Sequence, residues 1–275
     1  MNWNWNRGRV EHDGEDIYWE LVNTGPGDQR PVVVLSHGAG GSHAAWYQQV
    51  PALSTRFQVL TWDSRGFGNS TNRNDAPSAP AAAADLTAVL DSLSADYAGM
   101  ERVHLVGQSM GGWHISAFAL TQPTRVLSLT YADTVGGLWT PELREAMAGF
   151  QAEGGLGGRG EPEVIGGHRA LWPGTAERDL RLAFLYQTLG SFFSAPLDRL
   201  GDTIAWTVSH DQIAALGVPV LFIAGRHDQI FPAPLLAASA ASIPGARYAE
   251  IPDAGHSPYF EQPDLWNEAL LGFLP

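Results

Sequence analysis

Short apolar runs closed by Gly or Asp recur along the chain and alternate with segments of helical periodicity. The runs occupy residues 31–36, 57–62, 102–106, 125–131 and 218–224. A short run of β-branched and aromatic residues is typical of a strand that is buried on both faces of a parallel sheet. Because strands and helices alternate, the sequence predicts an α/β fold with a mainly parallel sheet.

The segments between these runs have the periodicity of helices. Residues 81–98 carry apolar side chains at helical spacing, and Pro123 ends the helix predicted over residues 110–121. Two later segments, 232–242 and 263–273, have Pro near their starts. A further strand is expected at 247–251. Residues 9–23 alternate weakly, which favours antiparallel strands at the edge of the sheet.

The alternation breaks between about residues 135 and 215. This stretch has clustered glycines and then aromatic-rich helical sequence, such as residues 179–186. We interpret residues 135–215 as a helical cap inserted into a core domain of residues 1–134 and 216–275. The alternative is that this stretch covers a second face of the core domain.

Length and charge narrow the classes of function. A chain of 275 residues suits one large domain or a domain with an insertion. Its net charge of -13 disfavours nucleic acid and anionic membranes as partners. The absence of cysteine excludes thiolate catalysis and disulfides. We see no secretory signal and no apolar run long enough for a membrane span, and therefore expect a cytoplasmic protein.

Ser109 lies in the spacing Gly107-x-Ser109-x-Gly111, after a predicted strand and before a predicted helix. On such a sharp turn the backbone of the serine is strained, and its Cβ crowds neighbours two residues away on each side. Glycine at those positions relieves the clash and leaves the serine oxygen clear of the sheet. The dipole of the following helix favours negative charge at this point. We therefore predict that Ser109 is a nucleophile.

A nucleophilic serine requires a base and an acid that orients the base. His256 follows the strand expected at 247–251, and Asp228 follows the run at 218–224. Both are therefore expected at the carboxyl edge of the sheet, where catalytic groups gather. Asp133, after the run at 125–131, is the alternative acid. Asp253 is expected to be a turn residue.

The negative oxygen of a tetrahedral intermediate requires two hydrogen-bond donors. One is expected to be the backbone N–H of Met110, which follows the serine. The other is expected in the loop His37-Gly38-Ala39-Gly40, where Ala39 N–H is our choice. His37 itself is expected to hold this loop in place.

Together these motifs resemble the α/β-hydrolase superfamily, in its branch with a helical cap. The matching residues are His37-Gly38, Asp63-x-Arg65-Gly66-x-Gly68-x-Ser70, Gly107-x-Ser109-Met110-Gly111-Gly112, Asp228 and Gly255-His256. The resemblance implies an eight-stranded, mostly parallel sheet flanked by helices, with the cap entering after the strand at 125–131. In this family an aspartate in place of Ser109 would imply haloalkane dehalogenase or epoxide hydrolase chemistry.

The expected reaction is hydrolysis of a carboxylic ester or lactone of a mainly apolar small molecule, with no metal or organic cofactor. The histidines do not have the spacing of a zinc site. Apolar side chains of the cap favour such a substrate. The residues that we select as pocket candidates are Trp46, Trp113, Trp139, Phe184, Tyr186 and Phe192. Four arginines of the cap are considered for binding a substrate carboxylate: Arg159, Arg169, Arg178 and Arg181.

Three other functions stay open at this point. Carbon–carbon hydrolases of ring-cleavage products share Ser-Met-Gly-Gly with this chain, but they usually carry Asn before the serine and Trp after the histidine. This chain has Gln108 and Ser257 at those positions. A slow-turnover ligand sensor and a cofactor-free lyase or oxygenase would use the same fold, because a fold alone does not fix function. The oligomeric state is left open.

Overall fold

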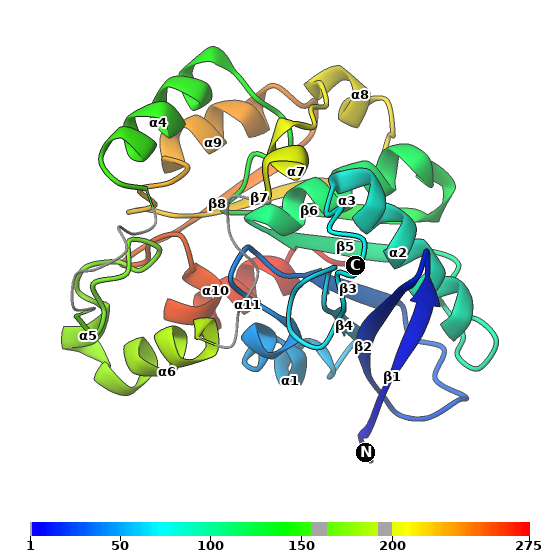
Figure 1. Ribbon diagram of the computed structural model, residues 1–275. Helices are drawn as coiled ribbons and strands as arrows, with labels where there is room; N and C mark the ends of the chain where they lie inside the picture. The colour runs from blue at the N-terminus through cyan, green and yellow to red at the C-terminus, as the bar shows by residue number, and fades with distance from the viewer. Residues whose placement is uncertain (1, 156–163, 192–199) are drawn as a thin grey trace.

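The computed structural model describes residues 2–155, 164–191 and 200–275. This part of the chain is built around one sheet. Its strand order is β1-β2-β4-β3-β5-β6-β7-β8 (Figure 1). The strands from β4 to β8 in this order pair in parallel, whereas β2 pairs antiparallel with β1 and β4. Their bounds are β1 Asn4–His12, β2 Glu15–Asn23, β3 Val32–Ser36, β4 Gln58–Trp62, β5 Val103–Gln108, β6 Val126–Ala132, β7 Val220–Gly225 and β8 Arg247–Ile251.

Helices cover both faces of the sheet (Figure 1). Residues of β3 are buried on both sides: Val32 and Val34 join one apolar cluster with α2, α3 and α9, and Val33 and Leu35 join another with α1 and α11. This two-sided burial explains why the strand sequence is apolar without alternation. These helices are α1 Gln49–Leu53, α2 Ala79–Leu93, α3 Met110–Thr121, α9 Ala233–Ala241 and α11 Pro263–Leu271. The predicted α/β fold is confirmed.

Two of the predicted elements differ from the observed ones by more than two residues at one end. The helix predicted over residues 81–98 begins at Ala79, where the Ser78 side chain accepts a hydrogen bond from Ala81 N, and ends at Leu93. The weakly alternating segment at 9–23 is a hairpin that begins earlier, at Asn4. Its turn has Asp13 at φ 51° and Gly14 at φ 74°, which is the signature of a type I′ turn. The edge strand β1 therefore also includes residues 4–8, which precede the weakly alternating segment.

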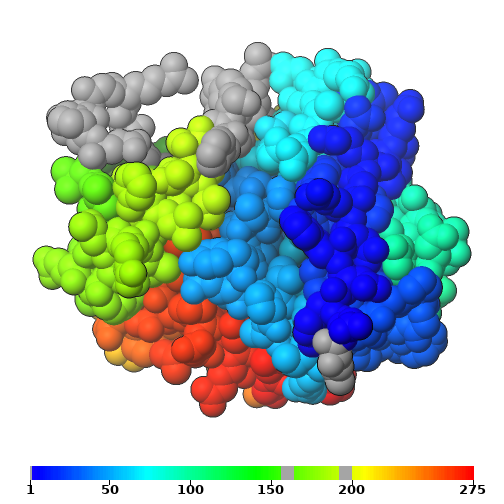
Figure 2. All heavy atoms as spheres, turned by 90° about the horizontal axis from the view of Figure 1, so that it is seen from below, coloured from blue at the N-terminus to red at the C-terminus, as the bar shows by residue number. Residues whose placement is uncertain are grey.

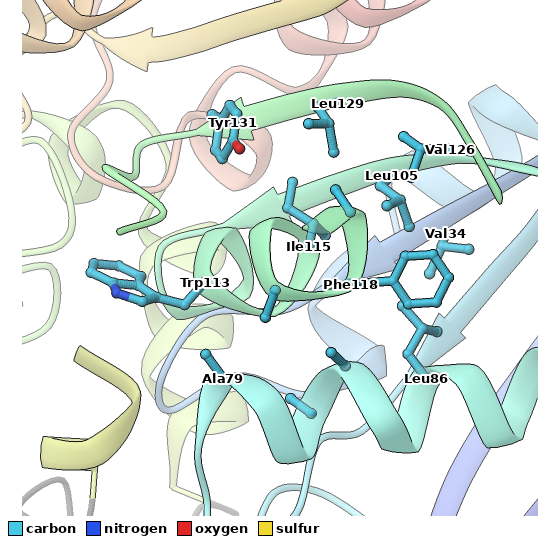
Figure 3. Close-up of a cluster of buried hydrophobic side chains, with 14 of the residues drawn as sticks. Val34, Ala79, Leu86, Leu105, Trp113, Ile115, Phe118, Val126, Leu129 and Tyr131 are labelled. Carbon is cyan, nitrogen blue, oxygen red and sulfur yellow. The ribbon is translucent and has the colours of Figure 1, made fainter. Parts of the chain in front are cut away.

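Figure 3 shows α3 lying between the sheet and α2, with Leu86 and Ala79 of α2 facing it. Ile115 and Phe118 of α3 are fully buried there, beside Leu105 of β5. Helix α3 is apolar on nearly all sides, because it is enclosed by the sheet, by α2 and by later helices. Ser109, the nucleophile candidate, therefore directly precedes a helix that is buried on nearly all sides.

The chain between β6 and β7 forms α4 Pro141–Ala152, α5 Thr175–Arg178, α6 Leu180–Gly190, α7 Gly201–Ala205 and α8 His210–Ala214. Leu143 and Phe150 of α4 and Ile213 of α8 join the apolar cluster that α2 and α3 form with the sheet. Helix α6 instead contacts the short helix η1 (His43–Trp46) and α10 (Pro258–Glu261), and Figure 2 shows it beside the segment near residue 50. The division into a core and a cap stays a prediction.

None of the helices in the described ranges is long and apolar enough to cross a membrane.

His114, one turn into α3, is a buried titratable group within this core. It is 3% exposed and lies against the ring of Trp62, with 5.8 Å between the ring centroids. Burial, together with the nearby His37, lowers the pKa of His114 to about 3. The native protein therefore holds this imidazole neutral at a pH where the unfolded chain protonates it.

The free energy of unfolding is expected to fall as the pH drops below about 6.5, because the unfolded chain then binds a proton that folded His114 does not. The contribution of this one group is about 1.4 kcal/mol per pH unit between about pH 6 and pH 4. Urea unfolding of the wild type and of His114→Leu, each at about pH 6 and about pH 4, measures this contribution. Each protein is compared with itself at pH 8, which removes the packing cost of the substitution, and equal slopes in the two proteins would contradict the prediction.

Candidate active site

Ser109 lies on the sharp turn between β5 and α3. Its φ of 48° and ψ of −119° are unusual for a residue other than glycine. Hydrogen bonds hold this backbone: Ser109 N donates to Ala132 O at 3.0 Å, and Ser109 O accepts from Thr134 Oγ1 at 2.6 Å. The neighbouring strand β6 and its following loop thus maintain the strained conformation that presents the serine.

The two glycines that flank Ser109 are required by contacts with backbone atoms, so the prediction that the serine Cβ requires them is wrong. A Cβ at Gly107 would lie 2.4 Å from the carbonyl oxygen of Gly111. One at Gly111 would lie 2.1 Å from the carbonyl oxygen of Ser36, at the end of β3. The start of α3 therefore passes directly over the ends of β5 and β3, and no side chain fits between them.

Gly111→Ala is expected to lower the free energy of unfolding by about 2–4 kcal/mol, because the added methyl group has only backbone atoms to displace. Urea unfolding measures the change. Gly149→Ala in α4 is the matched control: no described atom lies within 4 Å of its added Cβ, and it is expected to stabilise by about 0.5–1 kcal/mol. Wild-type stability in Gly111→Ala would contradict the close passage of α3 over β3.

His256 lies in the loop between β8 and α10, and Asp228 lies in the loop after β7. His256 Nδ1 and Asp228 Oδ2 are 2.9 Å apart, and both residues are buried. The other carboxylate oxygen, Asp228 Oδ1, accepts hydrogen bonds from the backbone N–H groups of Ile230 and Phe231 at 2.7 and 3.0 Å. The Asp228 carboxylate thus accepts three hydrogen bonds, and its contact with Nδ1 fixes the proton of a neutral His256 on that atom. Nε2 is then the ring atom that can take a proton.

The two other acids considered from the sequence do not contact the histidine ring by a hydrogen bond among the described residues. Asp133 accepts from Gly225 N at 2.7 Å and lies beside Asp228. Asp253 has a φ of 50°, and its carbonyl oxygen accepts a hydrogen bond from Arg178. Of the three acids, Asp228 is the one that the structure pairs with His256.

Ser109 and His256 line the same cavity, which has a volume of about 270 Å³. It opens beneath α6, and its other walls come from the loop after β3, from residues near 170 and from α10. Within the described residues no direct hydrogen bond joins the Ser109 hydroxyl to His256. The two residues are related by lining the same cavity.

The loop after β3 lies against the serine turn. A Cβ at Gly38 would lie 2.0 Å from Gln108 Oε1 and 3.0 Å from Ser109 Cβ, so a larger residue there would have to displace the Gln108 side chain. Ala39 lines the cavity, and its amide donates no hydrogen bond to a described residue. Met110 is the first residue of α3, where helical N–H groups have no partner within the helix. Both amides proposed as oxyanion donors are therefore available beside Ser109.

The side chain of His37 forms hydrogen bonds that hold this loop in place. Its Nδ1 lies 2.8 Å from Gly38 O, and its Nε2 accepts a hydrogen bond from Ser64 N at 3.1 Å. The imidazole is therefore neutral with its proton on Nδ1. Burial lowers the pKa of His37 below its usual value, although the charge of Asp63 acts in the opposite direction. Its contacts are those of a residue that holds the loop.

Gln108, the residue before the serine, joins the two halves of the site. Its Nε2 donates to the backbone oxygen of His256 at 3.0 Å, and its side chain also fills the space beside Gly38. In the sequence, Gln108 bears only on the carbon–carbon hydrolase alternative. Its position between the histidine loop and the β3 loop was not predictable from the sequence, because it depends on two distant segments.

The structure places the six pocket candidates in different surroundings. Tyr186 lines the cavity, and its hydroxyl accepts a hydrogen bond from Ser257 at 2.9 Å. Trp46 is fully buried against Tyr259 and Trp266. Three candidates lie elsewhere: Trp113 and Trp139 pack on each other and on Phe231, and Phe184 is 58% exposed on α6. Phe192 lies outside the described residues.

Several cavity residues were not singled out from the sequence. They include His168, which packs edge-on against Tyr186, and Phe260, two positions into α10. Phe260 follows His256 closely along the chain, which is the one signal that could have identified it. His168 carries no such signal, because its place depends on how the segment between β6 and β7 folds back over the sheet.

Two of the arginines considered for a substrate carboxylate bind other groups of the protein. Arg169 donates to Phe150 O and Gly155 O and pairs with the Glu153 carboxylate. Arg178 donates to the carbonyl oxygens of Asp253 and Glu261, at 2.9 and 2.8 Å, on either side of His256. Arg181 is not among the residues that line the cavity, and Arg159 lies outside the described residues.

The fold and the site together define a class of protein: an α/β hydrolase with a serine on a strand-to-helix turn and a histidine held by a carboxylate. The model of the alpha/beta hydrolase family matches residues 33–269. The chain therefore belongs to this family and is an enzyme of the hydrolase class.

Known proteins resemble it over nearly their whole length. "Putative carbamate hydrolase RutD" of Azorhizobium caulinodans is 31% identical over 95% of this chain and 96% of its own. 3-Oxoadipate enol-lactonase 1 of Acinetobacter baylyi is 26% identical over 90% of each chain. Among solved structures, a thermophilic esterase from Thermogutta terrifontis is 27% identical, with a TM-score of 0.76 over 97% of both chains. The relatives named here are hydrolases of different compounds.

Proposed function

We propose that this protein is a serine hydrolase that cleaves a carboxylic ester or lactone through an acyl-enzyme. The observation that carries the proposal is the shared cavity, which is lined by Ser109 and by a His256 that Asp228 holds in one tautomer. The names of the esterase and enol-lactonase that resemble the chain support the same chemistry.

In the proposed first step, His256 Nε2 takes the proton of Ser109 as its oxygen attacks the carbonyl carbon of the substrate. The amides of Ala39 and Met110 stabilise the negative oxygen that develops. His256 then gives its proton to the leaving oxygen, which departs and leaves the acyl group on Ser109. Water, deprotonated by His256, attacks the acyl group in the second step and restores the serine.

Ser109→Ala is expected to lower kcat for a short-chain aryl ester at least about 10³-fold, because the acyl-enzyme can no longer form. The wild type is expected to form a covalent adduct with a serine-directed phosphonate, and the variant is not. Hydrolysis assays and mass spectrometry of the intact protein measure the two effects. Ser94→Ala, at the exposed end of α2, is the matched control and keeps both properties.

A wild type that neither turns over a panel of aryl esters nor forms the adduct would contradict the proposal. Tight ligand binding in Ser109→Ala together with a change of shape on binding would instead support a ligand sensor. Turnover without any acyl-enzyme would support a lyase or an oxygenase.

The substrate is proposed to be a neutral and mainly apolar small molecule. Apart from His168 and His256, the described residues that line the cavity carry no side chain that takes a positive charge. All 16 basic residues of the chain are arginines; Arg169 and Arg178 are engaged elsewhere, and Arg159 and Arg199 lie outside the described residues. The negative charge of the protein also disfavours an anionic substrate.

A neutral aliphatic ester is therefore expected to have a kcat/KM at least about tenfold higher than an ester of the same length whose acyl chain ends in a carboxylate. Steady-state kinetics on such a matched pair measure the ratio at low and high salt. The high-salt measurement separates the long-range field of the protein from the lining of the cavity, because salt screens only the former. A preference for the carboxylate ester would contradict the proposal and favour a site with a bound anion.

A further inference from the structure

Asp133 is a buried acid that the proposed mechanism does not use. It directly follows β6 and is fully buried, with a φ of 48°. Its backbone N–H donates to Ile223 O at 2.8 Å, and its Oδ1 accepts from Gly225 N at 2.7 Å, so both groups bind the end of β7. These contacts fix the side chain in one place at the carboxyl edge of the sheet.

The second oxygen of this carboxyl group lacks a donor. Asp133 Oδ2 is buried and receives no hydrogen bond from a described N–H or O–H group. The carboxyl group that it meets is that of Asp228. A carboxylate oxygen offers no proton, so two ionised acids in this contact would repel each other with nothing between them. One proton shared by the pair removes this conflict.

The donors around the pair decide which acid holds the proton. Asp228 accepts three hydrogen bonds, from Ile230 N, Phe231 N and His256 Nδ1, whereas Asp133 accepts one. Hydrogen bonds to a carboxylate favour its ionised form, so Asp228 is the acid that stays charged.

The charged and titratable groups around Asp133 agree with this assignment. Burial and the negative charge of Asp228 hold the pKa of Asp133 well above its usual value, against the opposing hydrogen bond from Gly225. Glu261 of α10 adds a further negative charge. The other titratable groups of this region are His256 and three tyrosines, Tyr186, Tyr248 and Tyr259.

We propose that Asp133 is a neutral carboxylic acid that donates a hydrogen bond from Oδ2 to Asp228, and that it acts as a positioning residue for the Asp228–His256 pair. The bond adds a contact that helps to hold the Asp228 carboxylate in place. It also withdraws negative charge from Asp228, which limits how strongly that acid stabilises protonated His256.

The kinetic test compares two substitutions of Asp133. In Asp133→Asn the amide group can donate to Asp228 and accept from Gly225, so kcat/KM is expected within about threefold of the wild type, with the same apparent pKa in its pH profile. Asp133→Gly accepts the positive φ but removes the donor. Its kcat/KM is expected to fall about 10–100-fold, and its apparent pKa is expected to rise by about one unit.

An apparent pKa that falls in Asp133→Asn would overturn the proposal, since it would mean that a negative charge on Asp133 had been removed. Equal behaviour of Asp133→Gly and the wild type would also overturn it. Asp228→Asn is expected to lower kcat about 10⁴-fold in the same assays, because the histidine tautomer is then no longer fixed for proton transfer. A weaker effect of Asp228→Asn than of Asp133→Asn would move the acid to Asp133.

This kinetic test rests on the proposed function, in which His256 is the base, but a second readout does not. Infrared spectra at neutral pH are expected to show the carbonyl stretch of a protonated carboxylic acid in the wild type and its loss in Asp133→Asn. Glu261→Gln is the control for the other buried acid nearby, and the band assigned to Asp133 is expected to persist in it. If the band is unchanged in Asp133→Asn, the proposal fails whether or not the protein hydrolyses esters.

Discussion

The close passage of the α3 N-terminus over the ends of β5 and β3 is the constraint on which the site depends. Gly107 and Gly111 allow this passage because their hydrogens leave room for backbone carbonyl groups of Gly111 and Ser36. The same passage forces Ser109 to a positive φ and brings Gly38 against it. The position of the serine and that of the loop proposed to bind the oxyanion are thus two results of one backbone arrangement.

Three buried acids lie near one histidine, and their hydrogen-bond donors distinguish them. Asp228 has donors on both oxygens, one of them the histidine itself. Glu261 accepts from Trp172 N and Gly255 N at 2.7 Å each and from the hydroxyl of Thr175. Asp133 has a single donor. Since burial penalises every uncompensated charge, the number of donors determines which acids can remain ionised in this region.

The sequence was sufficient for the features that arise from local pattern and chain order. Apolar runs predicted the strands β3 to β7 to within two residues at their starts, because burial on both faces leaves a clear signal. The spacing around Ser109 and the order Ser109, Asp228, His256 predicted which groups would meet at the sheet edge. The five residues after Leu93 continue the apolar pattern of α2 without being helical, since periodicity alone does not show where a helix stops.

The lining of the cavity could not be predicted in the same way. Of the aromatic residues proposed for it, Trp46 and Trp113 serve the core, and Tyr186 reaches the cavity through the orientation of α6. A large apolar side chain has the same sequence signature in either place. Asp133 and Gln108 show the same limit for polar residues, because their partners lie on β7 and on the histidine loop, far along the chain.

The segment between β6 and β7 contacts the loop that carries His256, the proposed base, and also lines the cavity. Glu261 bonds Trp172 and Gly255, and Arg178 donates to the carbonyl oxygens of Asp253 and Glu261 on either side of His256. A Cβ at Gly255 would lie 2.6 Å from Trp172 N, so the histidine loop and this segment are packed backbone to backbone. A displacement of the segment therefore moves the histidine loop with it. Substitutions that reshape this wall of the cavity are for that reason coupled to the geometry of proton transfer, and their effects on substrate preference and on rate cannot be independent.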